Sequence, residues 1–444
     1  MPGTSVSAQL KIGSGLSGHL DAAMAAEYAA GRCAESLGGA TPDLVFCFFS
    51  AHHVESAANI AEAVRKRLSP RCLIGCSAEA VIGGEIEMEG APGVSLMGAV
   101  LPGVAVHPFF TDEIPIALKP KAAEEGAAQV AGFGPEHRAT FLLCDPFSVP
   151  LNALLPIMCN ARNLRAGGKP GERRPGPIIG GMCSAASKPE GNVLFLNERT
   201  LRSGGVGVGL SGPLRVDTLV SQGCRPIGPT MVITGCKGQM ITTLGGRPAM
   251  EVLSEVLDSL SEEGKQRLRR GLFIGRAISE YKERFGRDDF LIRNVIGVER
   301  ERGAIAVADL LRVGQTIQFH VRDAATAGED LGLLLDVQKL YEPPAGVLLF
   351  TCNGRGARLF DRPHHDAAAF ARAFAPPLSA EEQAKAGVPL TGSKTAGGKP
   401  GAGGVPLCGL FCAGEIGPVG EESFVHGQTA CAALFRAEPG AAGR

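Results

Sequence analysis

The feature that most constrains the fold of this chain is an order of sequence signals that occurs twice, about a hundred residues apart. Each copy begins with an apolar run typical of a buried strand, continues with apolar residues at helical spacing, and then has a second apolar run and two short strand-like segments. The segments are residues 43–50, 56–68, 71–76, 93–101 and 104–110 in the first copy, and 139–144, 151–161, 177–183, 204–210 and 214–220 in the second. This order predicts duplicated strand–helix–strand units that form mixed sheets in an α/β fold.

A different order of signals follows residue 235, where we place a domain boundary. Helical and strand-like segments alternate there, which predicts a second α/β domain. We expect helices at residues 248–260, 262–271, 323–340 and 366–375, and strands at 271–277, 291–297, 304–308, 316–321, 346–352 and 405–413. The predicted organisation is an N-terminal extension (1–40), a first domain (41–235) with repeats at 41–111 and 138–222, a second domain (236–436) with a flexible insertion at 387–404, and a tail (437–444).

The composition is that of a folded chain without a strongly charged surface. Hydrophobic residues make up 45% and charged residues 20% of the 444 residues. Lys and Arg number 44 against 45 Asp and Glu, a balance that does not favour a nucleic-acid partner. The 61 glycines and 30 prolines favour short elements joined by tight turns over a helical bundle.

The cysteines and the N-terminal sequence indicate in which cellular compartment the protein is expected. Most of the 13 cysteines lie in apolar runs, as Cys47 and Cys144 do, where a free thiol behaves as a small hydrophobic group in a reducing compartment. The start of the chain lacks the basic and apolar segments of a secretory signal. The longest uncharged run, residues 90–111, contains three prolines and predicts strands, not a membrane span. We predict a cytoplasmic protein without a membrane partner, with cleaved organelle targeting as the alternative.

Three motifs carry a resemblance to a known family. They are Leu-Ile-Gly-Cys-Ser-Ala-Glu-Ala-Val-Ile-Gly-Gly at residues 73–84, Cys-Asn-Gly-Arg-Gly-Ala-Arg-Leu-Phe at 352–360, and Gly-Leu-Phe-Cys-Ala-Gly-Glu-Ile-Gly-Pro-Val-Gly at 409–420, the last followed by Phe-Val-His-Gly-Gln-Thr-Ala at 424–430. The first resembles the N-terminal domain of the FIST family (F-box and intracellular signal transduction proteins), and the others resemble its C-terminal domain. Together these motifs and their flanking strands span residues 40–436.

The resemblance implies an intracellular sensory module that binds a small ligand, with amino acids as the proposed ligands. FIST domains are joined to signalling output domains in bacteria, and some follow an F-box that recruits a ubiquitin ligase in eukaryotes. Residues 1–40 are rich in Gly, Ala and Ser and lack the apolar density of an F-box. We therefore expect any output to come from a signalling or ubiquitin-ligase partner.

Glu415 is the strongest candidate for a ligand-binding residue. It follows a predicted buried strand in a glycine-flanked turn, where free backbone N–H groups and a carboxylate can bind both ends of a zwitterion. Cys76, Ser77 and Glu79 lie in the same Cys-x-x-Glu order after another predicted strand, which suggests a second loop that faces the same cleft. The alternative is that both carboxylates only cap backbone amides in tight turns.

Four further candidates come from the same two C-terminal motifs. Arg355, two residues after Asn353 and between two glycines, follows a predicted buried strand, and its guanidinium suits a ligand carboxylate. An ion pair within the fold is the alternative. His426 and Gln428 supply polar groups for the same cleft. The alternatives are a structural histidine and a helix at residues 429–435 that the polar side chains would cap.

The sequence does not favour a metal, a nucleotide or a catalytic residue. No Ser-His-Asp or Cys-His signature is present. Cys72 and Cys76, like Cys408 and Cys412, are four residues apart, which is too distant for zinc chelation on a strand, and no second pair has ligand spacing. The Gly-rich run at 205–209 lacks the helix start of a dinucleotide loop. Residues 364–366, His-His-Asp, are interpreted as the N-cap of a helix with exposed imidazoles.

The hypothesis from the sequence is therefore a sensory or signal-transduction protein without a cofactor, whose ligand is an amino acid or a similar small carboxylate. One alternative is a non-catalytic scaffold or substrate-recognition subunit that acts through protein partners. A thiol-dependent enzyme is a third hypothesis, which fast alkylation of one cysteine at neutral pH would favour.

Overall fold

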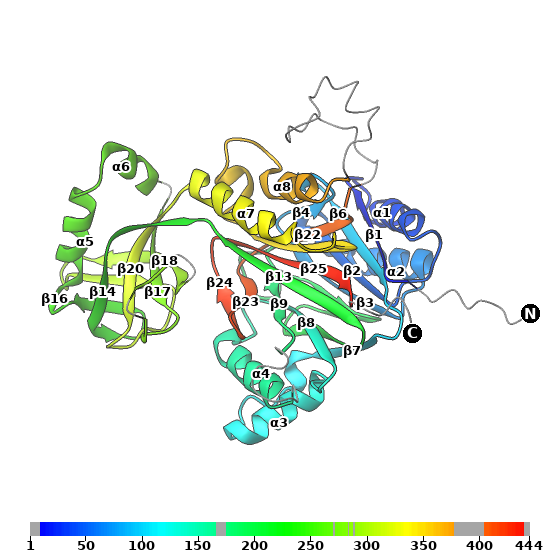
Figure 1. Cartoon of the computed structure of the whole chain (residues 1–444), viewed down its shortest axis with the longest axis horizontal. Helices are drawn as coiled ribbons and strands as arrows, with labels where there is room; N and C mark the ends of the chain where they lie inside the picture. The colour runs from blue at the N-terminus through cyan, green and yellow to red at the C-terminus, as the bar shows by residue number, and fades with distance from the viewer. Residues whose placement is uncertain are drawn as a thin grey trace, which may run out of the picture.

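The computed structural model describes residues 9–165, 175–269, 271–282, 284–286, 289–376 and 404–438. It has the mixed α/β fold that the sequence predicted. Three six-stranded sheets surround a common interior, helices cover their outer faces, and a separate β-barrel stands to one side (Figure 1). Residues 387–403 of the predicted insertion and 439–444 of the predicted tail lie outside the described residues.

The first sheet is built on two parallel strands whose residues are all buried. Antiparallel strands extend it on one side, so that four of its strands lie in the order β1-β6-β2-β3. The elements of this first unit are β1 (Lys11–Ser17), α1 (Ala22–Ser36), β2 (Leu44–Ser50), α2 (Ala57–Leu68), β3 (Cys72–Ala78), β4 (Val81–Gly83), β5 (Ile86–Met88) and β6 (Val94–Val100).

Strand β1 and helix α1 occupy the segment that we treated as an N-terminal extension. Small residues let the two pack closely: a Cβ atom on Gly15 would lie 2.0 Å from the carbonyl oxygen of Ala29. The Gly- and Ala-rich composition of this segment therefore reflects close packing of a helix on a strand rather than a lack of structure.

The other two sheets repeat the same order of elements. The second unit consists of β7 (Ala105–Phe110), α3 (Pro120–Val130), β8 (His137–Cys144), α4 (Leu151–Arg165), β9 (Ile178–Met182), β10 (Leu194–Leu196), β11 (Arg199–Leu201) and β12 (Gly205–Ser211). The third consists of β13 (Leu214–Gln222), α7 (Ala324–Gln338), β21 (Gly346–Cys352), α8 (His365–Ala373), β22 (Leu407–Cys412), β23 (Glu415–Val419), β24 (Glu422–His426) and β25 (Thr429–Ala437). In each unit the first and second core strands are parallel. The sequence predicted two such units, and the structure has three.

A glycine marks the same position in the second parallel strand of every unit. Gly75 pairs with Cys47, Gly180 with Leu142 and Gly409 with Leu349. A Cβ atom at these glycines would lie 2.1, 1.8 and 2.1 Å from the carbonyl oxygens of their partners. Only glycine permits this approach of the two backbones.

The three units exchange β-hairpins in a cycle. The hairpin of β4 and β5 from the first unit pairs with β22 of the third sheet. The hairpin of β10 and β11 from the second unit pairs with β3 of the first sheet. The hairpin of β23 and β24 from the third unit pairs with β9 of the second sheet. No unit therefore completes its own sheet.

The inner faces of the three sheets share one hydrophobic core. At its centre Phe141 of β8 contacts Phe46 of β2 and Phe435 of β25, with ring centroids 5.0 and 5.4 Å apart. Separate clusters fill the space between each sheet and its helices: α1 and α2 on the first, α3 and α4 on the second, and α7 and α8 on the third.

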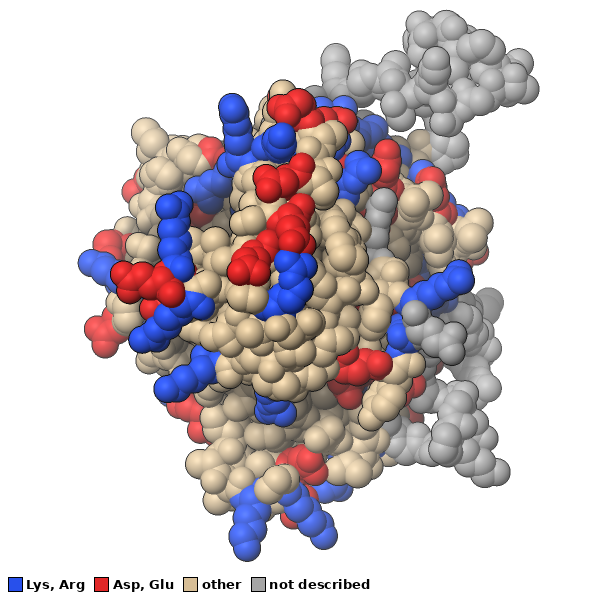
Figure 2. Space-filling model, turned by 90° about the vertical axis from the view of Figure 1, so that its left-hand side faces the viewer, with Lys and Arg blue, Asp and Glu red and all other residues tan. Residues whose placement is uncertain are grey.

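A β-barrel is inserted into the third unit, between β13 and α7. Its elements are β14 (Cys224–Lys237), β15 (Met240–Leu244), β16 (Arg247–Pro248), α5 (Ala249–Asp258), α6 (Glu262–Leu268), β17 (Leu272–Ala277), β18 (Phe290–Glu299), β19 (Ala304–Val307) and β20 (Thr316–Arg322). Strand β14 pairs with both β20 and β15, which closes the sheet. The barrel has a core of its own, and the face it presents in Figure 2 carries both signs of charge side by side.

Two local expectations differ from the structure. Residue 236, where the second domain was expected to begin, lies within β14. The helix considered at residues 429–435 is wrong, because this segment belongs to β25. Its alanine-rich sequence suits a helix, but the strand is buried on both faces between β13 and β21, where small side chains are needed.

Candidate functional site

Two of the predicted segments meet where the parallel strands β21 and β22 end. Cys352 and Cys412 pair at these ends, and the N–H of Asn353 donates to the carbonyl of Cys412 at 2.9 Å. The chain that leaves β21 carries Arg355, and the chain that leaves β22 carries Glu415. The carboxyl ends of parallel strands commonly form binding sites in α/β proteins.

Arg355 is fully buried and forms a two-point ion pair with Asp366, the second residue of α8. Its Nε lies 2.6 Å from Oδ2 and its Nη2 lies 2.8 Å from Oδ1. Burial acts to raise the pKa of Asp366, but the charge and hydrogen bonds of Arg355 hold that pKa well below its usual range. The ion pair within the fold that we considered as an alternative is therefore present, yet it leaves the Nη1 atom of Arg355 without a partner.

Glu415 is also fully buried, but no cation is bonded to it. Its Oε2 accepts hydrogen bonds from the backbone N–H and the hydroxyl of Thr429, at 3.2 and 2.7 Å. Burial raises the pKa of Glu415 to about 8, although these hydrogen bonds and the charge of Arg355 oppose the shift. Glu415 is thus mostly protonated at pH 7, and its Oε1 has no partner.

Five side chains around these strand ends hold a buried polar atom without a partner, and we call them the polar cluster. The atoms are Arg322 Nε, Asn353 Oδ1, Arg355 Nη1, Glu415 Oε1 and Gln428 Oε1. They account for more than half of the nine such atoms in the described part of the chain. Most buried polar atoms in proteins are bonded, so this concentration calls for a physical explanation.

Two glycines allow the side chains of the polar cluster to approach the backbone. A Cβ atom on Gly354 would lie 2.3 Å from Gln428 Oε1 and 2.8 Å from Arg322 Nη2. A Cβ atom on Gly223 would lie 3.1 Å from Arg355 Nη1. Gly223 joins β13 to the barrel and Arg322 ends β20, so the cluster lies where the barrel joins the three-sheet body.

Gln428 is held in an uncommon conformation, with a φ of 65° in the left-handed region. This conformation is rare for a residue other than glycine, asparagine or aspartate. Such strain is often found at functional sites, where the rest of the fold maintains it.

The remaining predicted residues have other partners. Ser77 is buried, and its hydroxyl accepts from the N–H of Val193 at 2.9 Å. Cys76 is part of the shared core. His426 is buried, and its Nε2 lies 3.0 Å from the carbonyl oxygen of Gly417 in the same hairpin. Burial lowers its pKa to about 4, so the ring is neutral at pH 7.

Glu79 lies beside the polar cluster, not within it. Its carboxylate forms an ion pair with Arg358, whose Nη1 also donates to the carbonyl of Asn353 at 3.1 Å. Both side chains are substantially exposed.

The sequence patterns did not indicate the carboxylates that organise Arg355. Glu87, from the hairpin of the first unit, accepts hydrogen bonds from the N–H groups of Asp366 and Ala367, each at 2.9 Å. His365 is buried against the ring of Phe360, so the expectation of exposed imidazoles at residues 364–366 is wrong for this histidine. The sequence feature that could have pointed to the partner of Arg355 is Asp366, an acidic residue in the first turn of a predicted helix.

The thiols around the cluster are poorly suited to nucleophilic chemistry. Burial raises the pKa of Cys352 to about 12 and the pKa of Cys412 and Cys431 well above the usual value. Within the described residues, no group of three or more His, Cys, Asp or Glu side chains is arranged to hold a metal ion. No helix in the described ranges is long and apolar enough to cross a membrane.

The fold and the site define an α/β protein of three sheet units with an inserted barrel and a buried polar cluster at their junction. Comparison with family models gives the family: the FIST N domain matches residues 43–247 and the FIST C domain matches residues 249–418. The chain belongs to the FIST family, whose domains are linked to signal transduction. The two models meet inside the barrel, between β16 and α5.

Similar proteins extend over nearly the whole chain. An uncharacterized protein of Mycobacterium tuberculosis is 35% identical over 431 residues, which cover 96% of this chain and 100% of that protein. An uncharacterized protein of Mycobacterium bovis is 34% identical over 432 residues, covering 96% and 99%. A crystal structure of a cyanuric acid hydrolase from A. caulinodans aligns with 10% identity and a TM-score of 0.24 over 48% of this chain and 72% of that chain, a similarity too low to support any inference.

Proposed function

We propose that this protein is a sensor that binds a small zwitterion, such as an amino acid, in the polar cluster. The proposal is supported by the chemical types of the five unpartnered atoms in the polar cluster. Two of them are guanidinium donors, on Arg322 and Arg355, and three are oxygen atoms, on Asn353, Glu415 and Gln428. A ligand carboxylate suits the first set, and a ligand ammonium group suits the second.

Buried polar groups without a hydrogen-bond partner are costly. Each such group costs about 1–3 kcal/mol relative to a bonded one, and charged groups cost more. A bound zwitterion satisfies donors and acceptors together, so its binding free energy would include the relief of several of these costs. Asn353 and Arg322 are only partly buried, whereas Arg355 and Glu415 are fully buried.

The position of the cluster suggests how binding would become a signal. The barrel is joined to the three-sheet body beside the cluster, where Arg225 and Arg267 of the barrel form ion pairs with Asp323, the N-cap of α7. Gln222 donates to the carbonyl of Phe290 at 2.9 Å, and Arg293 donates to that of Val425 at 3.0 Å. A ligand that contacts Arg322 would favour one orientation of the barrel, which a partner could recognise.

Calorimetric titration of the purified protein with the common amino acids tests the proposal. Glu415→Gln keeps an acceptor for Thr429 but cannot become an anion, and Asn353→Ala removes an oxygen that has no partner in the fold. We expect each variant to fold and to weaken binding at least tenfold, or about 1.4 kcal/mol. Glu255→Gln, at an exposed ion pair with Arg247 on the barrel, is the matched control and should bind normally.

The protonation of Glu415 provides a second measurement. An ammonium group favours the ionised carboxylate, whereas burial keeps Glu415 mostly protonated at pH 7. Binding should therefore release up to about one proton, and the binding enthalpy should vary with the ionisation enthalpy of the buffer. If no amino acid or small carboxylate binds to the folded protein, the proposal is wrong, and a scaffold that acts through protein partners becomes the better hypothesis.

A further inference from the structure

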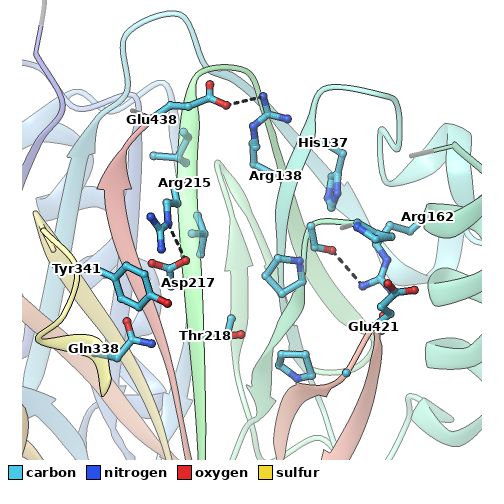
Figure 3. A pocket seen from close by; sticks show the side chains of 17 residues that line it. His137, Arg138, Arg162, Arg215, Asp217, Thr218, Gln338, Tyr341, Glu421 and Glu438 are labelled. Carbon is cyan, nitrogen blue, oxygen red and sulfur yellow. Dashed lines mark hydrogen bonds and ion pairs between the residues drawn. The ribbon is translucent and has the colours of Figure 1, made fainter. Parts of the chain in front are cut away.

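A cavity of about 450 Å³ lies between the second and third sheets, away from the polar cluster. It opens at the start of β8 and of β13, beside the turn between β23 and β24 (Figure 3). Its polar lining includes His137, Arg138, Arg162, Arg215, Thr218 and Tyr341. A volume of this size accommodates a small metabolite.

The first observation is a buried cation without a bonded counter-charge. Arg162 is 2% exposed, and its guanidinium donates to the carbonyls of Gly176, at 3.0 Å, and Glu421, and to the side-chain oxygen of Asn163 at 2.9 Å. All of these acceptors are neutral. Within the described ranges, no carboxylate forms an ion pair with Arg162, and burial lowers its pKa although the charges of Glu421 and Glu422 oppose the shift. Buried charges in proteins are usually paired.

Two buried nitrogen atoms without a partner lie beside Arg162. His137 is 7% exposed, and its Nε2 lies 2.8 Å from the hydroxyl of Thr140. Burial, together with the charges of Arg162 and Arg138, lowers the pKa of His137 to about 4, so the ring is neutral at pH 7. If Nε2 accepts from Thr140, Nδ1 carries the proton, and Nδ1 has no partner. The Nε of Arg138, whose side chain is 9% exposed, also lacks one.

The carboxylates of the lining are nearer to solvent than these cations. Asp217 is shared between Arg215 and Arg436, Nη2 of Arg138 pairs with both Glu136 and Glu438, and the Glu421 side chain is exposed. The exposed fractions of the Asp217 and Glu438 side chains are 21% and 35%. The buried part of the cavity is therefore cationic, and the acidic groups lie around it.

We propose that this cavity is a second binding site, which takes a small anion bearing a carboxylate or phosphate group. The anionic group would accept hydrogen bonds from Arg138 Nε and His137 Nδ1 and would supply the counter-charge for Arg162. The hydroxyl of Tyr341 and that of Thr218 are available to the rest of the ligand. This site is independent of the polar cluster and of the function proposed for it.

Calorimetric titration at pH 7 with inorganic phosphate and, separately, with succinate tests this site. Saturable binding of phosphate alone indicates a phosphorylated ligand, binding of succinate alone indicates a carboxylate ligand, and binding of both indicates a site for either group. Each outcome supports an anion site. Failure of both probes to bind the folded protein would overturn the proposal.

Variants locate the site. Arg138→Met keeps the length of the side chain but removes the charge and Nε, and we expect it to weaken anion binding at least tenfold. Arg71→Met, which removes an exposed arginine that pairs with Asp43 elsewhere, is the matched control and should have no effect. Glu415→Gln should also leave anion binding unchanged, which separates this test from that of the polar cluster.

A measurement on the unmodified protein covers the case in which Arg138→Met does not fold. In a sample with ¹⁵N-labelled histidine, the bound anion should shift the imidazole signals of His137, assigned with His137→Gln, and leave those of His426 unchanged. Anion binding without a shift at His137, or equal binding by a folded Arg138→Met variant, would contradict the assignment.

Discussion

Glu79 and Glu415 show how differently the fold uses two residues in the same sequence context. Both end the order Cys-x-x-Glu, but the Glu79 side chain is 39% exposed in an ion pair with Arg358, whereas Glu415 is fully buried. The equivalent glycines of the parallel strands, Gly75 and Gly409, allow the two motifs to be compared by position. Cys76 directly follows Gly75, whereas Cys412 is the third residue after Gly409, so the two motifs are two positions out of register. Their likeness in sequence does not correspond to equivalent positions in the fold.

The buried carboxyl of Glu415 contributes stability that is lost as pH rises from about 4.5 to 8. Its pKa rises from an ordinary value of 4.5 to about 8 on folding, so between these pH values the native state binds more protons than the unfolded state. We expect Glu415→Gln to match the wild-type protein near pH 4 and to exceed it at pH 8.5, by a few kcal/mol at most. Urea unfolding between pH 4 and pH 9 measures this difference.

Glu87 also contributes stability that is lost as pH rises. Burial, followed by repulsion from Asp366, raises its pKa to about 7. Buried His137, His320 and His426, whose pKa values are lowered to about 4, act in the opposite direction below about pH 6.5. Glu87 and these histidines are the same in both proteins, so the difference in stability between Glu415→Gln and the wild-type protein should grow between about pH 4.5 and pH 8 and reflect Glu415 alone. If the free energies of unfolding of the variant and the wild-type protein varied with pH in parallel, Glu415 would not be a buried carboxyl with a raised pKa.

Individual strands depend on close contact between backbones as well as on apolar side chains. The core strands were predictable because their apolar runs are long and bounded by turn residues, as in β2, β8 and β21. The first strand and helix were not, since glycine and alanine make their contacts through the backbone. The same property makes Gly75, Gly180 and Gly409 essential to the parallel pairs.

Substitution of Gly180 should be severely destabilising. Its Cβ atom would lie 1.8 Å from the carbonyl oxygen of Leu142, so the strands would have to separate. We expect Gly180→Ala to cost more than about 3 kcal/mol. Gly332→Ala, in helix α7 with no atom within 4 Å of the new Cβ, is the matched control and should stabilise the protein by up to about 1 kcal/mol. Thermal unfolding of both variants measures the contrast; equal behaviour would exclude the steric explanation.

The three units of the molecule share one central core, and the barrel has a core of its own. Each of the three sheets is completed by a hairpin from another unit, so no unit is expected to unfold alone. The barrel, by contrast, closes on itself around its own apolar residues. Two cooperative parts are therefore expected within one chain.

Differential scanning calorimetry should resolve two transitions. Phe141→Ala removes the ring that contacts two other sheets, and Phe319→Ala removes a buried ring of the barrel core. Each change should cost about 3–5 kcal/mol in its own part. We expect Phe141→Ala to lower one transition and Phe319→Ala the other. A single transition that both variants lower equally would indicate one cooperative unit instead.

The third unit escaped prediction because the barrel divides it. Strand β13 and helix α7 are separated by residues 223–323, so the repeated order of signals is interrupted in the sequence although it is continuous in space. Hydrophobic periodicity reports which segments are buried but not which segments they contact.

Local chemistry thus indicated the α/β class, the buried strands and the polar residues at their ends, because apolar runs, glycines and strand-end motifs act over a few neighbouring residues. Contacts between distant segments settled the roles of those polar residues. Arg355 is paired by Asp366, which Glu87 caps from 279 residues away, and Glu415 lies in an interior built from all three sheets. Such partners are brought together by hairpin exchange and by a shared core, and neither leaves a pattern of fixed spacing in the chain.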